Sequence, residues 1–311
     1  MSPDQDSIPY RRFVAPRFWP TWVLLGWIRL IALLPYPWPI TIGKWLGRIS
    51  LRLSRKTRHI VKRNLEVCFP ELSDAEREKL LKKHFEAVGA ALSEMGLGWF
   101  SSTERLLSLI RVEGLEHLEH ARKKDKGIIL LCAHFTSLET STSILGEFFP
   151  ELKTVYRPQP NEMIDALIYQ GRRRLAEQQI PKDNIRTMVR ALRNNGTVAY
   201  LADLANKGSS SALIPFFSEP AITTTTVSKL AKVTDATVLT YFFRRLPGKA
   251  GYVANIGAPL EDFPTDDVVA DTRRLVARLE DYIRLAPEQY MWTYRRFKGR
   301  PEPYPDIYRA E

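Results

Sequence analysis

A continuous apolar run in the middle of the chain sets the tightest limit on its fold. Residues 127–133 read GIILLCA and follow a basic turn. A strand with one face in water alternates polar and apolar residues, whereas an unbroken apolar run is typical of a strand that is buried on both faces. Such strands belong to parallel sheets that helices cover on both sides, so this run predicts an α/β protein.

The segments around this run support that interpretation. Ser73 and Glu76 form a capping-box pattern, which predicts a helix that extends to about residue 96. Strands that alternate with helices predict a mainly parallel central sheet flanked by helices. Further strands are expected at 110–112, 154–156, 197–201, 213–217, 238–243 and 252–256, and further helices at 114–123, 138–148, 161–178, 183–194, 222–233 and 266–285.

The most apolar segment lies near the N-terminus. Residues 18–43 carry four tryptophans and one charge, Arg29. A membrane span needs about 20 mostly apolar residues, and tryptophan favours the membrane interface. We therefore expect a tail at 1–17, a membrane-anchoring helix at 18–43 and one folded domain at 44–308. Arg29 and the three prolines between residues 35 and 39 leave two alternatives, a helix that lies in the interface and an aromatic helix packed on the domain.

The net charge of +11 favours acidic partners: nucleic acid, an anionic membrane or an acidic protein. Residues 1–66 hold twelve lysines and arginines against three acids, and these charges surround the apolar segment. That distribution predicts contact with an anionic membrane surface and no nucleic acid. Residues 44–67 are expected to form a basic amphipathic helix along the membrane. The basic residues that follow the apolar segment place the domain in the cytoplasm if that segment spans.

The positions of the cysteines and histidines favour neither a disulfide nor a metal site. Cys68 and Cys132 lie far apart in apolar surroundings, so we expect two small buried residues rather than a disulfide. His117 and His120 have no cysteine or ordered set of acids nearby to complete a metal site. We expect neither a metal nor an organic cofactor.

The candidate chemistry follows the apolar run directly. Residues 133–139 read AHFTSLE, which places His134 just after the strand and Glu139 in the next helix. The carboxyl edge of a sheet is where α/β proteins hold their sites. Glu139 there can accept a hydrogen bond from one ring nitrogen of His134 and leave the other free to take a proton. Such a pair suits a general base for a substrate hydroxyl. The pattern is short, and a surface hydrogen bond is the alternative.

Two other predicted strands also end in polar residues. Arg157 follows residues 154–156, and an arginine there can bind a phosphate or stabilise an oxyanion. Asp203 follows residues 197–201. The alternatives are a structural salt bridge for Arg157 and a turn cap for Asp203. Three strand ends that carry His, Arg and Asp favour a site at this edge.

Several segments together resemble the lipid A biosynthesis late acyltransferases, the lauroyl and myristoyl transferase family. They are AHFTSLE at 133–139, VYRP at 155–158, GRRR at 171–174 and APEQYMW at 286–292 with RRFKGRP at 295–301. The resemblance covers nearly the whole chain. It implies a fold similar to glycerolipid acyltransferases of the HxxxxD/E type, on the cytoplasmic face of the inner membrane of Gram-negative bacteria.

The resemblance also implies the reaction. The donor would be a fatty acyl thioester on acyl carrier protein, and the acceptor a hydroxyacyl chain on a Kdo-bearing lipid A precursor. By motif, His134 is the base and Glu139 its partner, and Arg157, Arg172 and Asp203 contact the substrate.

One segment departs from the family pattern. Residues 202–208 read ADLANKG, where the family has a segment like PDHDYG, so only the first acid is kept, as Asp203. A different lipid or hydroxyl acceptor is therefore an alternative. A thioesterase or lipid hydrolase, with water in place of the acceptor, is a second alternative. A membrane-binding protein without activity is a third, which the intact His134 and Glu139 pair disfavours.

Overall fold

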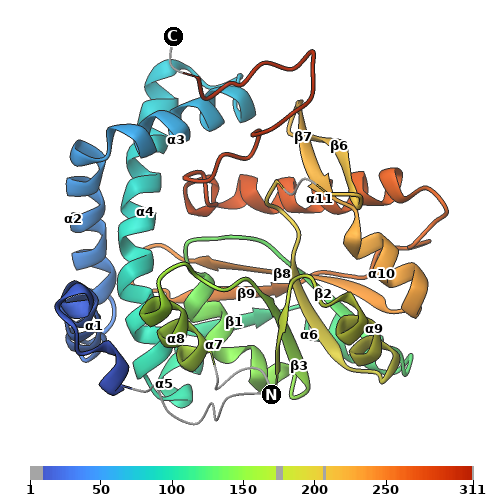
Figure 1. Cartoon of the computed structure of the whole chain (residues 1–311), viewed down its shortest axis with the longest axis horizontal. Coiled ribbons are helices and arrows are strands. Elements are labelled where there is room, and N and C mark those ends of the chain that lie inside the picture. The colour runs from blue at the N-terminus through green and yellow to red at the C-terminus, as the bar shows by residue number, and fades with distance from the viewer. Residues whose placement is uncertain (1–9, 173–177, 206–207, 310–311) are drawn as a thin grey trace.

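The computed structural model describes residues 10–172, 178–205 and 208–309. Among these residues, a central sheet has the strand order β1-β9-β8-β2-β5-β3-β4 (Figure 1). Every neighbouring pair is parallel except β8 and β9. The mainly parallel sheet is thus confirmed. The strands are β1 (Ile110–Glu113), β2 (Ile128–Cys132), β3 (Leu152–Tyr156), β4 (Gln178–Pro181), β5 (Thr197–Leu201), β8 (Thr237–Arg245) and β9 (Tyr252–Ile256).

Helices cover both faces of the sheet, and the side chains of β2 divide between them. Leu130 packs in a core with residues of α4, α5, α6 and α7, whereas Ile129 packs in a second core with residues of α9, α10 and α11. All five residues of β2 are buried, as the apolar run predicts. These helices are α4 (Asp74–Phe100), α5 (Thr103–Leu107), α6 (Leu115–Arg122), α7 (Leu138–Phe148), α9 (Ile185–Arg193), α10 (Thr226–Thr234) and α11 (Val268–Leu285).

The N-terminal part differs from the expected single anchor helix. It forms α1 (Trp19–Ala32) and α2 (Trp38–Leu53), and α3 (Arg55–Cys68) follows. The chain breaks between α1 and α2 because proline lacks an amide hydrogen and disfavours helical geometry in the residue before it. Pro35 and Pro37 lie in that break. Over the part of the chain described above, no helix combines the length and the apolar character that crossing a bilayer requires.

The helix α2 belongs to the folded domain. Its glycines pack directly against α4, so that a Cβ atom at Gly47 would lie 2.0 Å from the carbonyl oxygen of Phe85. A Cβ at Gly89 would lie 2.2 Å from the oxygen of Gly43. Any larger side chain at these positions would push the two helices apart. Residues 38–43, expected in the anchor, are therefore part of this helix pair, and the helix expected at 44–67 is interrupted at Ser54.

Two other elements differ from the predicted ones. The helix expected at 161–178 is α8 (Glu162–Gly171), and its predicted C-terminal end is outside the described residues or in β4. The helix expected at 222–233 begins only at Thr226, because residues before it form β7 (Glu219–Thr224), which pairs with β6 (Ser211–Phe216). Ile222, Thr223 and Thr224 at the end of β7 are β-branched, and β-branched residues favour strands.

The C-terminal segment, residues 286–309, crosses the domain and is held by buried polar contacts. The side chain of Asn64 on α3 donates to the backbone oxygens of Trp292 at 2.7 Å and Tyr294 at 2.8 Å. It also accepts from the hydroxyl of Tyr308 at 2.6 Å. Within this segment, Tyr290 forms an antiparallel bridge with Phe135, three residues beyond the end of β2.

His84 on α4 gives the first testable prediction. The side chain is fully buried, and its Nδ1 lies 2.9 Å from the backbone oxygen of Glu288. Burial lowers the pKa of the imidazole from 6.5 to about 4. Between these values the unfolded chain binds a proton that the folded chain does not. The free energy of unfolding therefore falls as the pH falls from 6.5 to 4, by about 3 kcal/mol from this group.

His84→Asn keeps a donor for the Glu288 oxygen and does not titrate. We expect denaturant titrations of this variant to show a weaker loss of stability between pH 6.5 and 4 than the wild type. Equal pH dependence in the two proteins would contradict the assignment.

Candidate active site

The register of two central strands brings His134 and Asp203 together. Strands β2 and β5 are parallel neighbours, and Cys132 pairs with Leu201 at their carboxyl ends. His134 lies two residues beyond Cys132, and Asp203 lies two residues beyond Leu201. The two side chains therefore emerge at the same level of the sheet edge, where α/β proteins hold their ligands.

Both carboxylate oxygens of Asp203 contact His134. Oδ1 lies 2.7 Å from ring atom Nδ1, and Oδ2 accepts a hydrogen bond of 2.9 Å from the backbone amide of His134. Burial alone would raise the pKa of Asp203, but the His134 ring and these two hydrogen bonds outweigh it and hold the pKa below its ordinary value. An ionised Asp203 accepts the Nδ1 proton, which leaves the Nε2 lone pair of His134 free.

This arrangement differs from the expected role of Asp203. Its side chain is only 1% exposed and contacts His134, so Asp203 is placed to orient His134, and its predicted contact with a substrate stays a prediction. The side chain of His134 itself is 26% exposed and reaches the cavity described below.

Glu139 has a different partner from the one its spacing suggests. It lies in the first turn of α7, and its carboxylate contacts the Arg172 guanidinium at 2.5 Å and the Trp99 ring nitrogen at 3.3 Å. Among the contacts described for Glu139, none involves His134. The predicted hydrogen bond from His134 is thus made to Asp203, and Glu139 holds Arg172 instead.

A cavity of about 470 Å³ opens beside His134. Its walls include apolar side chains such as Leu138, Leu145 and Phe243, and its cations are Arg157, Arg172, Lys182 and Lys298. Among its described lining residues there is no carboxylate. The cavity therefore suits a ligand with an apolar chain and an anionic group.

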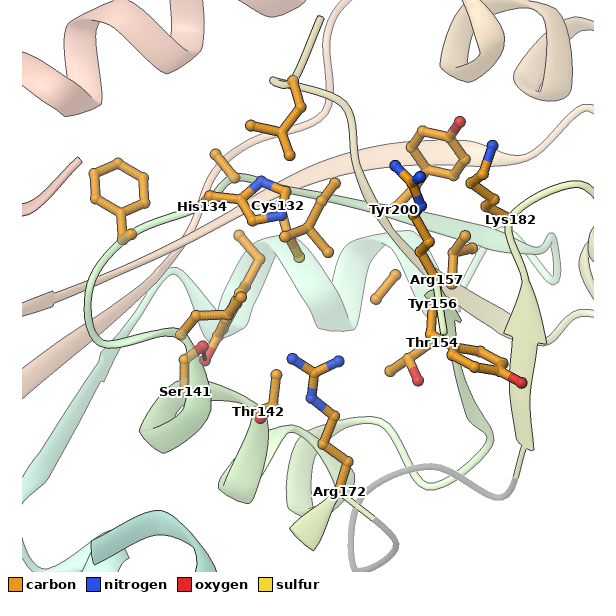
Figure 2. Close-up of a pocket in the computed structure, with 18 of the residues that line it drawn as sticks. Cys132, His134, Ser141, Thr142, Thr154, Tyr156, Arg157, Arg172, Lys182 and Tyr200 are labelled. Carbon is orange, nitrogen blue, oxygen red and sulfur yellow. Dashed lines mark hydrogen bonds between the residues drawn. The ribbon is translucent and has the colours of Figure 1, made fainter. Parts of the chain in front are cut away.

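The cations come from several elements. Tyr156 pairs with Pro181 at the ends of β3 and β4, so Arg157 and Lys182 follow as neighbours. Figure 2 shows both beside Tyr200, away from His134, while Arg172 approaches from the side of Ser141 and Thr142. Within the described part of the chain, the Arg157 guanidinium has no hydrogen-bond or ion-pair partner. It is available for an anion. Residues 173 and 174 of the basic run lie outside the described residues.

Side chains with potential nucleophilic atoms also line the cavity, among them Cys132, Ser141 and Thr142. Cys132 is a free, buried thiol, and burial first and the charge of Asp203 second raise its pKa well above the ordinary value. Ser141 Oγ donates to the hydroxyl of Tyr241 at 3.2 Å, and Thr142 Oγ1 donates to the backbone oxygen of Glu139 at 3.0 Å. His134 is not in hydrogen-bond contact with any of the three. The geometry fits a histidine that acts on a substrate group.

Sequence reasoning missed two of the cavity's cations. Lys182 follows β4, a strand that was not expected, and Lys298 lies in the C-terminal segment over the ring of Tyr294. The neighbouring hydroxyl of Tyr294 donates to the oxygen of Ala205 at 3.1 Å and so supports the loop after Asp203. No local pattern marks these residues, because each joins the site through strand order or the path of the C-terminal segment.

Comparison with known proteins adds independent evidence. Residues 9–299 match the family described as bacterial lipid A biosynthesis acyltransferase. This chain belongs to that family. A lipid A biosynthesis lauroyltransferase of Escherichia coli (strain K12) is 37% identical over 294 residues, which cover 94% of this chain and 96% of the relative.

Two further members of the family are similar over the same length. A palmitoleoyltransferase of lipid A biosynthesis from the same organism is 36% identical, with 94% of this chain and 95% of the relative covered. A lipid A biosynthesis acyltransferase of Haemophilus influenzae (strain ATCC 51907 / DSM 11121 / KW20 / Rd) is 35% identical, with 95% and 96% covered. The lipid A acyltransferase family anticipated from the sequence is confirmed.

Proposed function

We propose that this protein transfers a fatty acyl group from a thioester on acyl carrier protein to the hydroxyl of a hydroxyacyl chain on a Kdo-bearing lipid A precursor. The observation that carries the proposal is the free Nε2 of His134 at a cavity with apolar walls and cations. The names of the similar proteins, which include lauroyl and palmitoleoyl transferases, support a fatty acyl group as the cargo.

The chemistry follows from the placement of His134. Its Nε2 takes the proton from the acceptor hydroxyl as the oxygen attacks the thioester carbonyl. The tetrahedral oxyanion collapses, the carbon–sulfur bond breaks, and the thiolate takes the proton back from the imidazolium. Asp203 stabilises that imidazolium and fixes its orientation. The thioester is already activated, so the reaction requires no cofactor.

Arg157 and Arg172 have different proposed roles. Arg157 is unpaired within the described residues and is placed for a phosphate of either substrate. Arg172 is held by Glu139 in the cavity wall, where its guanidinium stabilises negative charge near the thioester carbonyl. Glu139 acts in this proposal through Arg172.

The test uses the full chain in detergent with labelled acyl thioesters on carrier protein or coenzyme A, with and without a tetra-acylated Kdo-lipid A precursor. Mass spectrometry reads the lipid product. We expect a penta-acylated lipid, formed faster from the carrier-protein donor. Thioester hydrolysis at an equal rate with and without the acceptor would favour the thioesterase alternative and overturn the proposal. If product formed only with another hydroxylated lipid, that lipid would replace the lipid A precursor as the proposed acceptor.

We also propose that the protein rests on the inner membrane through α1 and α2, on its cytoplasmic face. These helices expose Trp19, Val23, Trp38 and Trp45, each at least 59% exposed. Exposed basic residues such as Arg29 and Arg52 lie among them. Apolar and basic side chains together are typical of a helix that binds an anionic membrane interface.

Removing two of the exposed rings tests this surface. We expect Trp19→Ser with Trp38→Ser to weaken binding to anionic phospholipid vesicles by about 10-fold or more, because apolar area is lost from the contact. Cosedimentation measures the effect. Val233→Ser, which changes an exposed apolar residue on α10, is the matched control. Equal losses in the two proteins would rule out a specific α1–α2 surface.

A further inference from the structure

The loop that carries His134 is hydrogen-bonded to residues 289–291, which lie far away in the sequence. The backbone amide of Thr136 donates to the backbone oxygen of Gln289 at 2.8 Å, and the backbone amide of Met291 donates to the backbone oxygen of His134 at 2.9 Å. Phe135 and Tyr290 thereby form an antiparallel bridge. The backbone from His134 to Thr136, beyond the end of β2, is therefore held by residues 289–291.

The side chain of Gln289 fixes residues 289–291 in turn. Its Oε1 accepts from the amide of Arg245 at 2.8 Å, and its Nε2 donates to the oxygen of Arg245 at 2.9 Å. Arg245 is the last residue of β8, which runs parallel to β2 and ends at the same edge. Gln289 is 4% exposed, so both hydrogen bonds are shielded from water. Few side chains other than a primary amide supply a donor and an acceptor in this geometry.

A second path leads from Arg245 back to the loop. Its guanidinium donates to Oε1 of Glu94 at 2.7 Å, in an ion pair whose side chains are 6% and 1% exposed. Ser137, at the start of α7, donates to the same oxygen at 3.3 Å. Thr136 and Ser137 are adjacent, so the contacts close into a buried ring around the loop, formed by Gln289, Arg245, Glu94, Ser137 and Thr136.

We propose that Gln289 is a positioning residue that holds His134 with Nδ1 on Asp203 and Nε2 in the cavity. This inference rests on the proposed function for its effect on turnover. Hydrogen bonds to the loop backbone restrict the position of the His134 Cα atom, from which the side chain extends. The imidazole must stay in line with both Asp203 and the substrate hydroxyl. Displacements of about 1 Å in such an arrangement cost about 10²-fold in rate.

The test is Gln289→Met, which keeps the length of the side chain and removes both hydrogen bonds. Ser228→Ala is the matched control, because it removes another buried hydrogen bond, from Ser228 to Asp271 at 2.7 Å, between α10 and α11. We expect Gln289→Met to lower kcat about 10- to 100-fold with little change in KM, since the cavity walls and cations are untouched. Ser228→Ala should leave both constants near the wild-type values.

A substrate-free readout separates this inference from the proposed function. Nuclear magnetic resonance of protein labelled at histidine nitrogens reports the Nδ1 proton that His134 shares with Asp203, assigned by its loss in His134→Ala. We expect that signal to weaken or disappear in Gln289→Met and to persist in Ser228→Ala. An unchanged signal and unchanged kcat in a folded Gln289→Met protein would overturn the proposal. If the wild type showed no acyl transfer but Gln289→Met still lost the signal, the positioning role would be supported and the proposed reaction rejected.

Ser137→Ala is the second variant and serves if Gln289→Met does not fold. It removes only the 3.3 Å hydrogen bond to Glu94 on the other side of the ring. We expect a smaller loss of kcat than for Gln289→Met, again with KM retained. A larger effect on KM than on kcat would contradict a role in positioning His134.

Discussion

Replacing His134 with alanine will lower the rate of acyl transfer by about 10²- to 10⁴-fold, the range that a positioned general base contributes. The side chain is 26% exposed and contacts Asp203 rather than the apolar core, so the protein should still fold. Circular dichroism and thermal unfolding check the fold, and mass spectrometry of the lipid product measures the rate.

The matched control is His117→Ala, which removes a histidine of α6 whose side chain is 35% exposed. It should transfer acyl groups at the wild-type rate. If the folded His134→Ala protein retained full activity, the base would have to be another group, and the central claim would be lost.

The second large effect is expected from Asp203→Asn, which keeps the size of the side chain. An asparagine amide can donate to Nδ1 of His134, and the ring proton would then move to Nε2. A histidine protonated at Nε2 cannot take a proton from the acceptor hydroxyl. By analogy with the same exchange in a Ser-His-Asp triad, we expect kcat to fall by about 10³- to 10⁴-fold.

Glu139→Gln discriminates between the two acids that follow strands near His134. It keeps a hydrogen-bonding group for Arg172 and Trp99 but removes the charge that pairs with Arg172. The structure predicts a smaller loss of kcat than for Asp203→Asn. The reverse order of effects would mean that Glu139 orients His134 during turnover.

The sequence was most informative where the evidence was local. The apolar run of β2 and the His134 turn after it were predictable because burial on both faces leaves a clear pattern. The pairing of His134 with Asp203 was not, because it depends on β5, rather than β3, lying next to β2. Strand order is a long-range property, and the spacing of His134 and Glu139 pointed instead to the acid nearest in the chain.

Other differences have similar causes. The length and hydropathy of residues 18–43 suggested one helix, but the close contact of Gly43 and Gly47 with α4 can only be seen in the folded chain. Gln289 is a polar residue in an irregular segment, and nothing in its neighbours indicates that it meets the end of β8. Its partners are brought to it by the path of the C-terminal segment across the sheet edge.

The state of Cys132 has a consequence for the order of events in turnover. A covalent route through an acylated Cys132 would need its thiolate, and burial raises the pKa of this thiol well above the ordinary value, which disfavours that form at neutral pH. Under the proposed function, we expect the donor to stay intact until the acceptor binds. Initial rates measured against both substrates should give intersecting rather than parallel double-reciprocal lines. Labelled carrier thiol should not exchange into the thioester while the acceptor is withheld.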